Sequence, residues 1–129
     1  MYLETTDEPK QIYGRFPWGL LLITDDASNE AVPTWDEKSA PVTSSSTALV
    51  VKVLHEVDGL VTVRVARQQS ASEGVVMFDG AIDVPSGTLR VSDATADQAI
   101  RVDVAPGPLS LRIIGERRES PTAIEVVLT

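Results

Sequence analysis

The sequence predicts an all-β fold, an antiparallel β-sandwich of about eight strands with little helix. Apolar and polar residues alternate along most apolar stretches, which gives each strand one buried and one wet face. Turn residues recur roughly every 8–12 residues, a spacing typical of sandwiches. At 129 residues with 43% hydrophobic residues, the chain is long enough to bury one core. We therefore expect residues 1–129 to form a single domain, with 1–11 as a loose lead-in that need not be ordered.

The first predicted strands lie on either side of a proline. Residues 12–23 are rich in apolar side chains but contain Pro17, and proline within a sheet belongs at an edge or a bulge. We therefore predict an edge segment that leads into a buried strand at about 18–24, covered on both faces. An acidic turn follows it. Thr34 lies three residues before Glu37, the spacing of a capping box, so a single helical turn is expected there.

Residues 48–66 are predicted to form a β-hairpin. Two alternating apolar runs in this stretch are separated by Asp58-Gly59, which is a strong signal for a tight turn. A second Asp-Gly pair, at 79–80, interrupts the next apolar stretch. Residues 75–84 are therefore predicted to form either one broken strand or two short ones.

Four more strands complete the predicted sandwich, at 88–92, 98–104, 109–115 and 123–128. Before the third of them, Pro106 fixes φ near −65° and Gly107 accepts a positive φ, which together suit a type II turn. Such a turn twists the wrong way for a tight two-residue hairpin. We therefore predict a corner that carries the chain from one packed sheet to the other. For the same reason, Gly107→Val is expected to destabilise the fold strongly.

Composition narrows the class of protein. The formal net charge of −8 has the wrong sign for direct nucleic-acid binding, because phosphate contacts come from Lys and Arg. No apolar run approaches the roughly 18 residues of a membrane span, and the acidic N-terminus does not resemble a signal peptide. There is no cysteine, hence no disulfide framework. We expect a cytoplasmic protein.

Recognised catalytic and metal-binding motifs are missing from the sequence. The single histidine, His55, comes at a predicted strand end, and no motif ties a nucleophile to it. One histidine and no cysteine do not make a zinc site, and the acids at 25–30 lack the spacing of a calcium loop. The glycines form no phosphate-binding loop. We predict no enzymatic activity and no cofactor, and keep a hydrolase built on His55 as an alternative.

Acidic and aromatic residues are concentrated in the first 40 residues, which hold eight acids against three bases. Aromatic anchors beside charged rims are typical of protein interfaces. The competing interpretation is that Phe16 and Trp18 fill the core, and we expect this of both. Trp35 lies in a Pro-Thr-Trp-Asp loop and is expected to be partly exposed. The candidate partner-binding residues are Asp25, Asp26, Trp35, Asp36 and Glu37.

The order of these elements resembles the competence-protein J family of small bacterial β-sandwich proteins. The matching elements are the aromatic leading strand at 18–26, Trp35-Asp36-Glu37, the long hairpin at 49–65, the glycine-led strand at 87–92 and the Pro-Gly corner within 102–113. The resemblance covers about residues 12–128. The founding member of the family is described as an inhibitor that binds a DNA-entry nuclease. The resemblance therefore implies an acidic protein that docks on a basic nuclease, with no catalytic residue.

Two functions remain open at this point. The first is a non-enzymatic interaction protein that binds a basic protein partner, as an inhibitor or immunity protein for a nuclease or toxin. The second is a β-sandwich that binds a small molecule or carbohydrate, with Trp35 and Tyr13 as stacking platforms. The sequence indicates neither the identity of the partner nor the oligomeric state.

Overall fold

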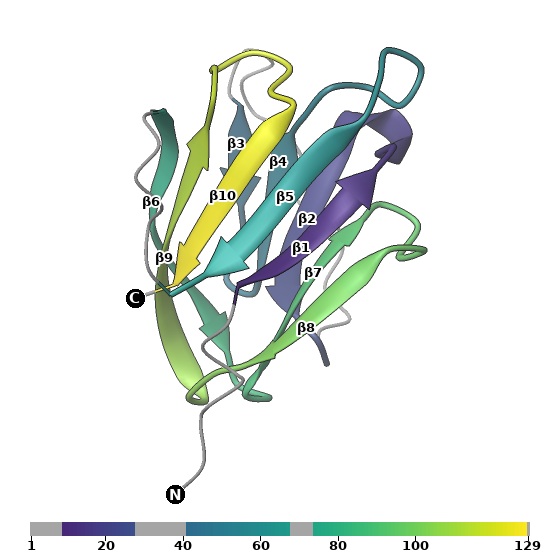
Figure 1. Ribbon diagram of the computed structural model, residues 1–129. Helices are drawn as coiled ribbons and strands as arrows, with labels where there is room; N and C mark the ends of the chain where they lie inside the picture. Colours follow the sequence, from purple (N-terminus) through teal and green to yellow (C-terminus); the bar gives the residue numbers. More distant parts are fainter. Residues whose placement is uncertain (1–8, 28–40, 68–73, 129) are drawn as a thin grey trace, which may run out of the picture.

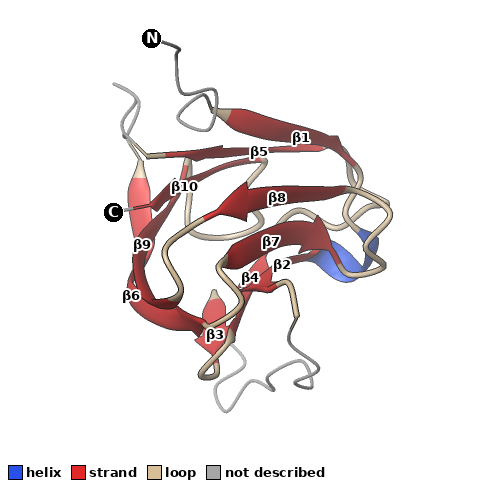
Figure 2. Ribbon diagram, turned by 90° about the horizontal axis from the view of Figure 1, so that it is seen from below, coloured by secondary structure: helices blue, strands red, loops and turns tan. Residues whose placement is uncertain are grey.

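The computed structural model describes residues 9–27, 41–67 and 74–128. These residues form two five-stranded sheets that pack face to face (Figures 1 and 2), which confirms the predicted all-β sandwich. Sheet A has the strand order β1-β5-β10-β9-β6, and sheet B has the order β3-β4-β2-β7-β8. The elements are β1 Lys10–Gly14, the 3₁₀ turn η2 Pro17–Gly19, β2 Leu20–Asp25, β3 Val42–Ser44, β4 Ala48–Lys52, β5 Val61–Ala66, β6 Val75–Val84, β7 Thr88–Asp93, β8 Ala99–Asp103, β9 Gly107–Gly115 and β10 Ala123–Leu128.

The core lies between the two sheets and follows the period of two in the sequence. In β5, for example, Val61, Val63 and Val65 are buried while Thr62 and Arg64 between them are half-buried. Burying one such aliphatic side chain stabilises the fold by roughly 1.5–3 kcal/mol. Because β1, β5 and β8 contribute inward-facing residues in this way, the alternation read from the sequence also identifies much of the core.

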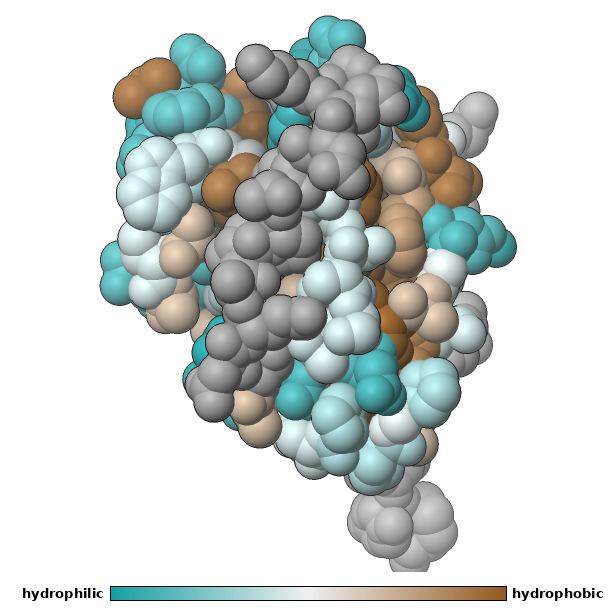
Figure 3. Space-filling model, turned by 180° about the vertical axis from the view of Figure 1, so that it is seen from behind, coloured by the Kyte–Doolittle hydropathy of each residue, from teal (hydrophilic) through white to brown (hydrophobic). Residues whose placement is uncertain are grey.

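Strand β2 is central in sheet B, between β4 and β7. Its inward residues Leu21 and Ile23 are fully buried, and its outward residues Leu20 and Leu22 are half-buried. The expected burial on both faces is therefore complete on one face and partial on the other. Seen from the side of sheet B in Figure 3, hydrophobic residues are interspersed with hydrophilic ones.

The pairing of β10 departs from a purely antiparallel sandwich. This strand lies between β5 and β9; it is antiparallel to β9 and parallel to β5, with Ile124 opposite Val63 and Val126 opposite Val65. A parallel pair needs a long connection between its strands, and the chain supplies one because β6 to β9 come between β5 and β10. All other strand pairs in the described part of the chain are antiparallel.

The predicted hairpin at 48–66 is wrong. Strand β4 pairs with β2 and β3 in sheet B, whereas β5 pairs with β1 and β10 in sheet A. In the segment that crosses between the sheets, Leu54 N donates to the carbonyl of Pro121, 3.0 Å away. A turn does form before Gly59, closed by Asp58 N and His55 O at 2.9 Å, so the Asp-Gly signal marked a turn but not the pairing of its flanks.

The predicted corner after Val104 is confirmed. Strand β8 belongs to sheet B and β9 to sheet A, and Gly107 adopts the positive φ of +113° that the prediction required. The approach to the corner is fixed by a hydrogen bond of 2.9 Å from Val104 N to the carbonyl of Gly87. At this corner the chain leaves sheet B and enters sheet A, where it continues as β9 and β10.

Smaller differences concern the ends and breaks of strands. Residues 75–84 form one strand, and its irregularity lies between Val76 and Phe78 rather than at the Asp-Gly pair. Strand β1 already begins at Lys10, inside the predicted lead-in, and the short strand β3 was not predicted. The helical turn predicted from Thr34 and Glu37 falls outside the described residues.

Candidate functional site

The turn that precedes β2 places one aromatic residue inside the fold and the next outside it. Gly19 N donates to Phe16 O at 2.9 Å, and Trp18 between them has φ 59° and ψ 8°. With Pro17 before it, Trp18 occupies the third position of a type II turn, where glycine or asparagine is preferred. Phe16 is fully buried, as expected. The expected burial of Trp18 is wrong: its side chain is 65% exposed, because the turn directs the indole out of the sandwich.

The turn is fixed on the segment that crosses between the sheets. Val53 N donates to Gly19 O at 2.9 Å, and a Cβ at Gly19 would lie 2.8 Å from Val53 O and 3.3 Å from the α-carbon of His55. Arg15 Nη1 adds a hydrogen bond of 2.6 Å to Glu56 O. Only glycine fits beside Trp18, and the indole therefore stands on a rigid backbone.

Exposed apolar residues gather in these two joined segments. Among the described residues, six large hydrophobic side chains are exposed, and four of them lie within 13–18 and 57–60. We call these four the Trp18 surface: Tyr13, Trp18, Val57 and Leu60. Because Arg15 binds Glu56 and Gly19 packs against His55, the two segments present their apolar residues at the same end of the sandwich.

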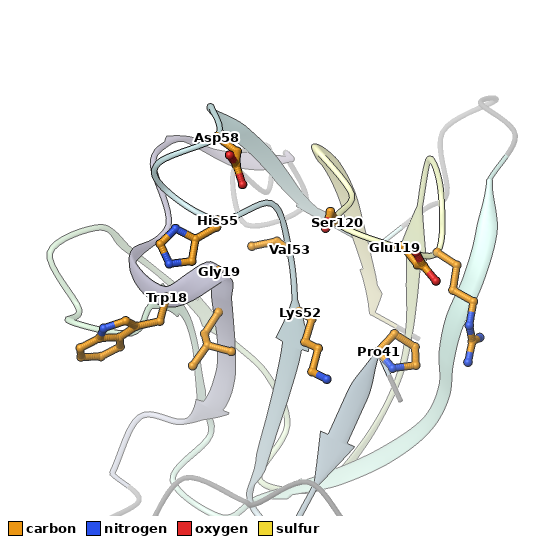
Figure 4. Close-up of a pocket in the computed structure, with 11 residues that line it drawn as sticks. Trp18, Gly19, Pro41, Lys52, Val53, His55, Asp58, Glu119 and Ser120 are labelled. Atoms are coloured by element: carbon orange, nitrogen blue, oxygen red, sulfur yellow. The ribbon is translucent and has the colours of Figure 1, made fainter. Parts of the chain in front are cut away.

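An open cavity of about 420 Å³ lies beside Trp18 (Figure 4). Trp18 and Glu119 lie on opposite sides of its opening. The lining carries both charges, with Lys52 and Arg118 against Asp58 and Glu119. Ser120, which also lines it, has a positive φ of 47°, so a strained backbone borders the cavity on two sides.

The acids at this end of the sandwich differ in whether they form ion pairs or hydrogen bonds within the chain. Within the part of the chain that the structure describes, Glu56, Asp58 and Glu119 form no ion pair. Glu116, in the turn before β10, accepts hydrogen bonds from the backbone N–H groups of Thr122 and Ala123 at 2.8 and 3.2 Å. Burial raises the pKa of the Glu116 carboxyl, but a hydrogen bond from the Thr122 hydroxyl, the two backbone bonds and the charge of Arg117 outweigh it, so its pKa lies below the ordinary value.

The first two predicted partner-binding residues lie at the other end of β2. Asp25 is only 3% exposed, and its Oδ1 accepts hydrogen bonds from the hydroxyl of Ser86 and, at 3.1 Å, from Ser86 N. Asp26 is half-buried and accepts a hydrogen bond of 3.0 Å from Arg101 Nε, with Arg90 3.9 Å away. Both carboxylates are therefore engaged within the chain. Trp35, Asp36 and Glu37 lie outside the described residues.

The groups considered for chemistry do not assemble into a catalytic arrangement. His55 is half-buried, and its Nδ1 accepts a hydrogen bond of 3.2 Å from Val57 N. In the described ranges, no hydrogen bond joins the imidazole to a hydroxyl or carboxylate side chain, and no cluster of three or more potential ligands could hold a metal ion. Tyr13 is exposed on β1 and does not line the cavity. No helix among the described residues is long and apolar enough to cross a membrane.

Sequence reasoning missed Trp18 as a surface residue. Its hydropathy and its position before an apolar strand both favour burial. A signal does exist: Pro17 suits the second position of a type II turn, which puts the next residue at a positive φ. The proline favours a positive φ at Trp18, and this backbone conformation directs the indole away from the core.

The arrangement of strands defines the chain as a small β-sandwich with the competence-protein J fold. The crystal structure of ComJ from Bacillus subtilis, an inhibitor of the DNA degrading activity of NucA, matches with a TM-score of 0.67. The match covers 94% of this chain and 93% of that one, at 8% sequence identity. A structure described as crocagin biosynthetic gene J matches with a TM-score of 0.51 and 15% identity, over 92% and 94% of the two chains. No family model matches the sequence, and no curated protein is similar to it. The predicted resemblance is thus confirmed for the fold.

Proposed function

We propose that this chain is a cytoplasmic, non-enzymatic interaction protein that binds a basic protein partner and inhibits it, the partner being a nuclease or toxin. The observation that carries the proposal is the fold shared with ComJ, the nuclease inhibitor, over 94% of the chain. Fold alone does not define function. The net charge of −8 supports it independently, because an acidic protein is attracted to a basic surface and associates with it quickly at low salt.

The residues predicted from the sequence remain the proposed electrostatic contact. Asp36 and Glu37 would supply the charge and Trp35 an apolar anchor. Asp25 and Asp26 would have a supporting role, since their carboxylates are bound to Ser86 and Arg101 within the chain.

The test is inhibition of nucleases from the organism that encodes the chain. Those with a pI above about 8 are purified singly, and plasmid degradation is followed while the chain is titrated in. We expect saturable inhibition of one nuclease at a stoichiometric ratio, weakening as salt is raised from about 50 to 300 mM. Full activity of every nuclease in the presence of excess chain would contradict the inhibitor function.

A charge-matched pair of variants tests the proposed contact. Asp36→Lys/Glu37→Lys removes the predicted acids and should weaken inhibition strongly. Asp97→Lys/Asp103→Lys changes the net charge by the same amount at two exposed positions. It should weaken inhibition less, because only the long-range attraction to the partner is reduced. Equal effects of the two variants would show that net charge alone matters.

Binding of a small molecule or carbohydrate is the second candidate function, favoured by the open cavity beside Trp18. Its test is a titration with mono- and oligosaccharides followed by ¹H–¹⁵N NMR. Resonance shifts confined to the Trp18 indole and the cavity lining would support this candidate. Unchanged spectra at millimolar ligand would count against it.

A further inference from the structure

We propose that the chain holds its protein partner at the Trp18 surface, and that the occupant is a basic protein face with an apolar socket for the Trp18 indole. The inference rests on the proposed function in one respect, that the partner is a protein. It does not require that this partner be a nuclease.

The first argument is the backbone strain at Trp18. A tryptophan at φ 59° occupies a region that favours glycine, and a Gly-Gly or Asn-Gly pair would make the same turn without strain. The fold gains little in exchange, because the side chain is 65% exposed. Strained residues that folding does not explain are concentrated at functional sites. A role in binding accounts for a large aromatic side chain at this position.

The second argument is rigidity. The turn is closed by Gly19 N and Phe16 O, and Val53 N and Arg15 tie it to the segment that crosses between the sheets. A backbone that is already fixed loses little conformational entropy on binding, and this favours affinity. The segment that carries the indole therefore needs no ordering when a partner binds.

The third argument is charge. Glu56 and Asp58 flank Val57 directly in the sequence, and neither forms an ion pair within the described ranges. An apolar centre with a charged rim is the anatomy of protein interfaces. Cations are also present: Lys52 and Arg118 line the adjacent cavity, and Arg15 keeps its charge when it donates to the Glu56 carbonyl. The charged rim therefore carries both signs, and it is the formal net charge of −8 on the whole chain that favours a basic partner.

Photo-crosslinking in cells of the encoding organism locates the contact. p-Benzoylphenylalanine replaces Trp18 or Val57 in two variants, and the exposed residues Ala81, on β6, or Ala105, before β9, in two controls. We expect adducts from positions 18 and 57 to a protein with a basic surface, identified by mass spectrometry. Adducts only from positions 81 and 105, only to a second copy of this chain, or from no position would overturn the proposal.

Calorimetric titration with the purified crosslinked protein then measures the anchor. Trp18→Gly should weaken binding by roughly 100-fold while its Tm stays at least as high as that of the wild type. Val76→Ala, which truncates an exposed apolar residue on β6, should change the affinity by no more than about twofold. Unchanged affinity of Trp18→Gly, or an acidic partner, would refute the proposal. A basic partner without nuclease or toxin activity would refute the inhibitor function and leave the surface established.

Discussion

The two ends of β2 use similar residue types in opposite ways. At its C-terminal end, the adjacent acids Asp25 and Asp26 bind Ser86 and Arg101 within the chain. At its N-terminal end, Trp18 is exposed, and Glu56 and Asp58 nearby form no ion pair with another described residue. A cluster of acids in the sequence thus includes two that hold the fold together, whereas Glu56 and Asp58, which form no ion pair among the described residues, lie near an exposed aromatic residue. Internal partners, rather than residue type, distinguish the acids at the two ends.

Gly19→Val should give the largest loss of stability and shows how rigid the Trp18 end is. The new side chain would meet backbone atoms of Val53 and His55 at a φ of +65°, so we expect a loss of about 3 kcal/mol or more in urea unfolding. The matched control is the neighbouring Trp18→Gly, expected within about 1 kcal/mol of the wild type. Similar losses for both variants would mean that the indole stabilises the fold after all.

Gly107→Val tests the corner at the opposite end. No neighbouring atom lies within 4 Å of a Cβ at this position, and φ is +113°, so the loss comes from backbone strain alone. We expect about 2 kcal/mol in the same assay, less than for Gly19→Val. Stability close to that of the wild type would show that the corner relaxes to a negative φ without difficulty.

Asp25→Ala tests whether the acid at the corner end is structural. Loss of the carboxylate leaves Ser86 N–H without its acceptor, which should cost about 1.5 kcal/mol and speed hydrogen exchange in the turn between β6 and β7. Asp26→Ala is the control; Asp26 is half-buried, but its partner Arg101 is exposed, so the ion pair should contribute less than about 1 kcal/mol. The reverse order of the two effects would assign the structural role to Asp26.

The smallest effect is a pH dependence that arises from Glu116. Its pKa is lowered in the folded chain, so the contribution of its carboxylate to stability is present above the pKa of the unfolded chain and is lost as pH falls through the folded value. Glu116→Gln should therefore lower the urea midpoint slightly at pH 7, and the difference from the wild type should shrink at acid pH. A constant difference across this range would exclude the carboxylate charge as its source.

The sequence predicted the strands and the corner well because both depend on local patterns. Alternation located β7 and β10 within a residue or two, and the Pro106-Gly107 pair located the change of sheet. It failed for the 48–66 hairpin because the pairing of a strand is decided far away in the chain. Leu54 is held by Pro121, a partner that no pattern around Asp58-Gly59 contains.

The candidate site was less predictable for the same reason. The partner of Asp25 is 61 residues away and that of Asp26 is 75 residues away, so a run of acids gives no indication that two of them are engaged. For Trp18, hydropathy favoured burial, while one turn dihedral set the direction of the side chain. The exposure and pairing of a site residue depend on such single contacts, which the local sequence does not show. The fold class depends on a pattern repeated over many residues, which it does show.

The central place of β10 has a consequence for the order in which the protein can form. β10 is the last described strand in the chain, yet it joins β5 to β9 in the middle of sheet A. Until residues 123–128 have left the ribosome, sheet A consists of two separate pieces, β1-β5 and β9-β6, each with an unpaired edge. Such edges invite pairing with other chains. Cooperative folding must therefore follow synthesis of β10. A chain whose synthesis stops before this strand leaves two strand edges unpaired.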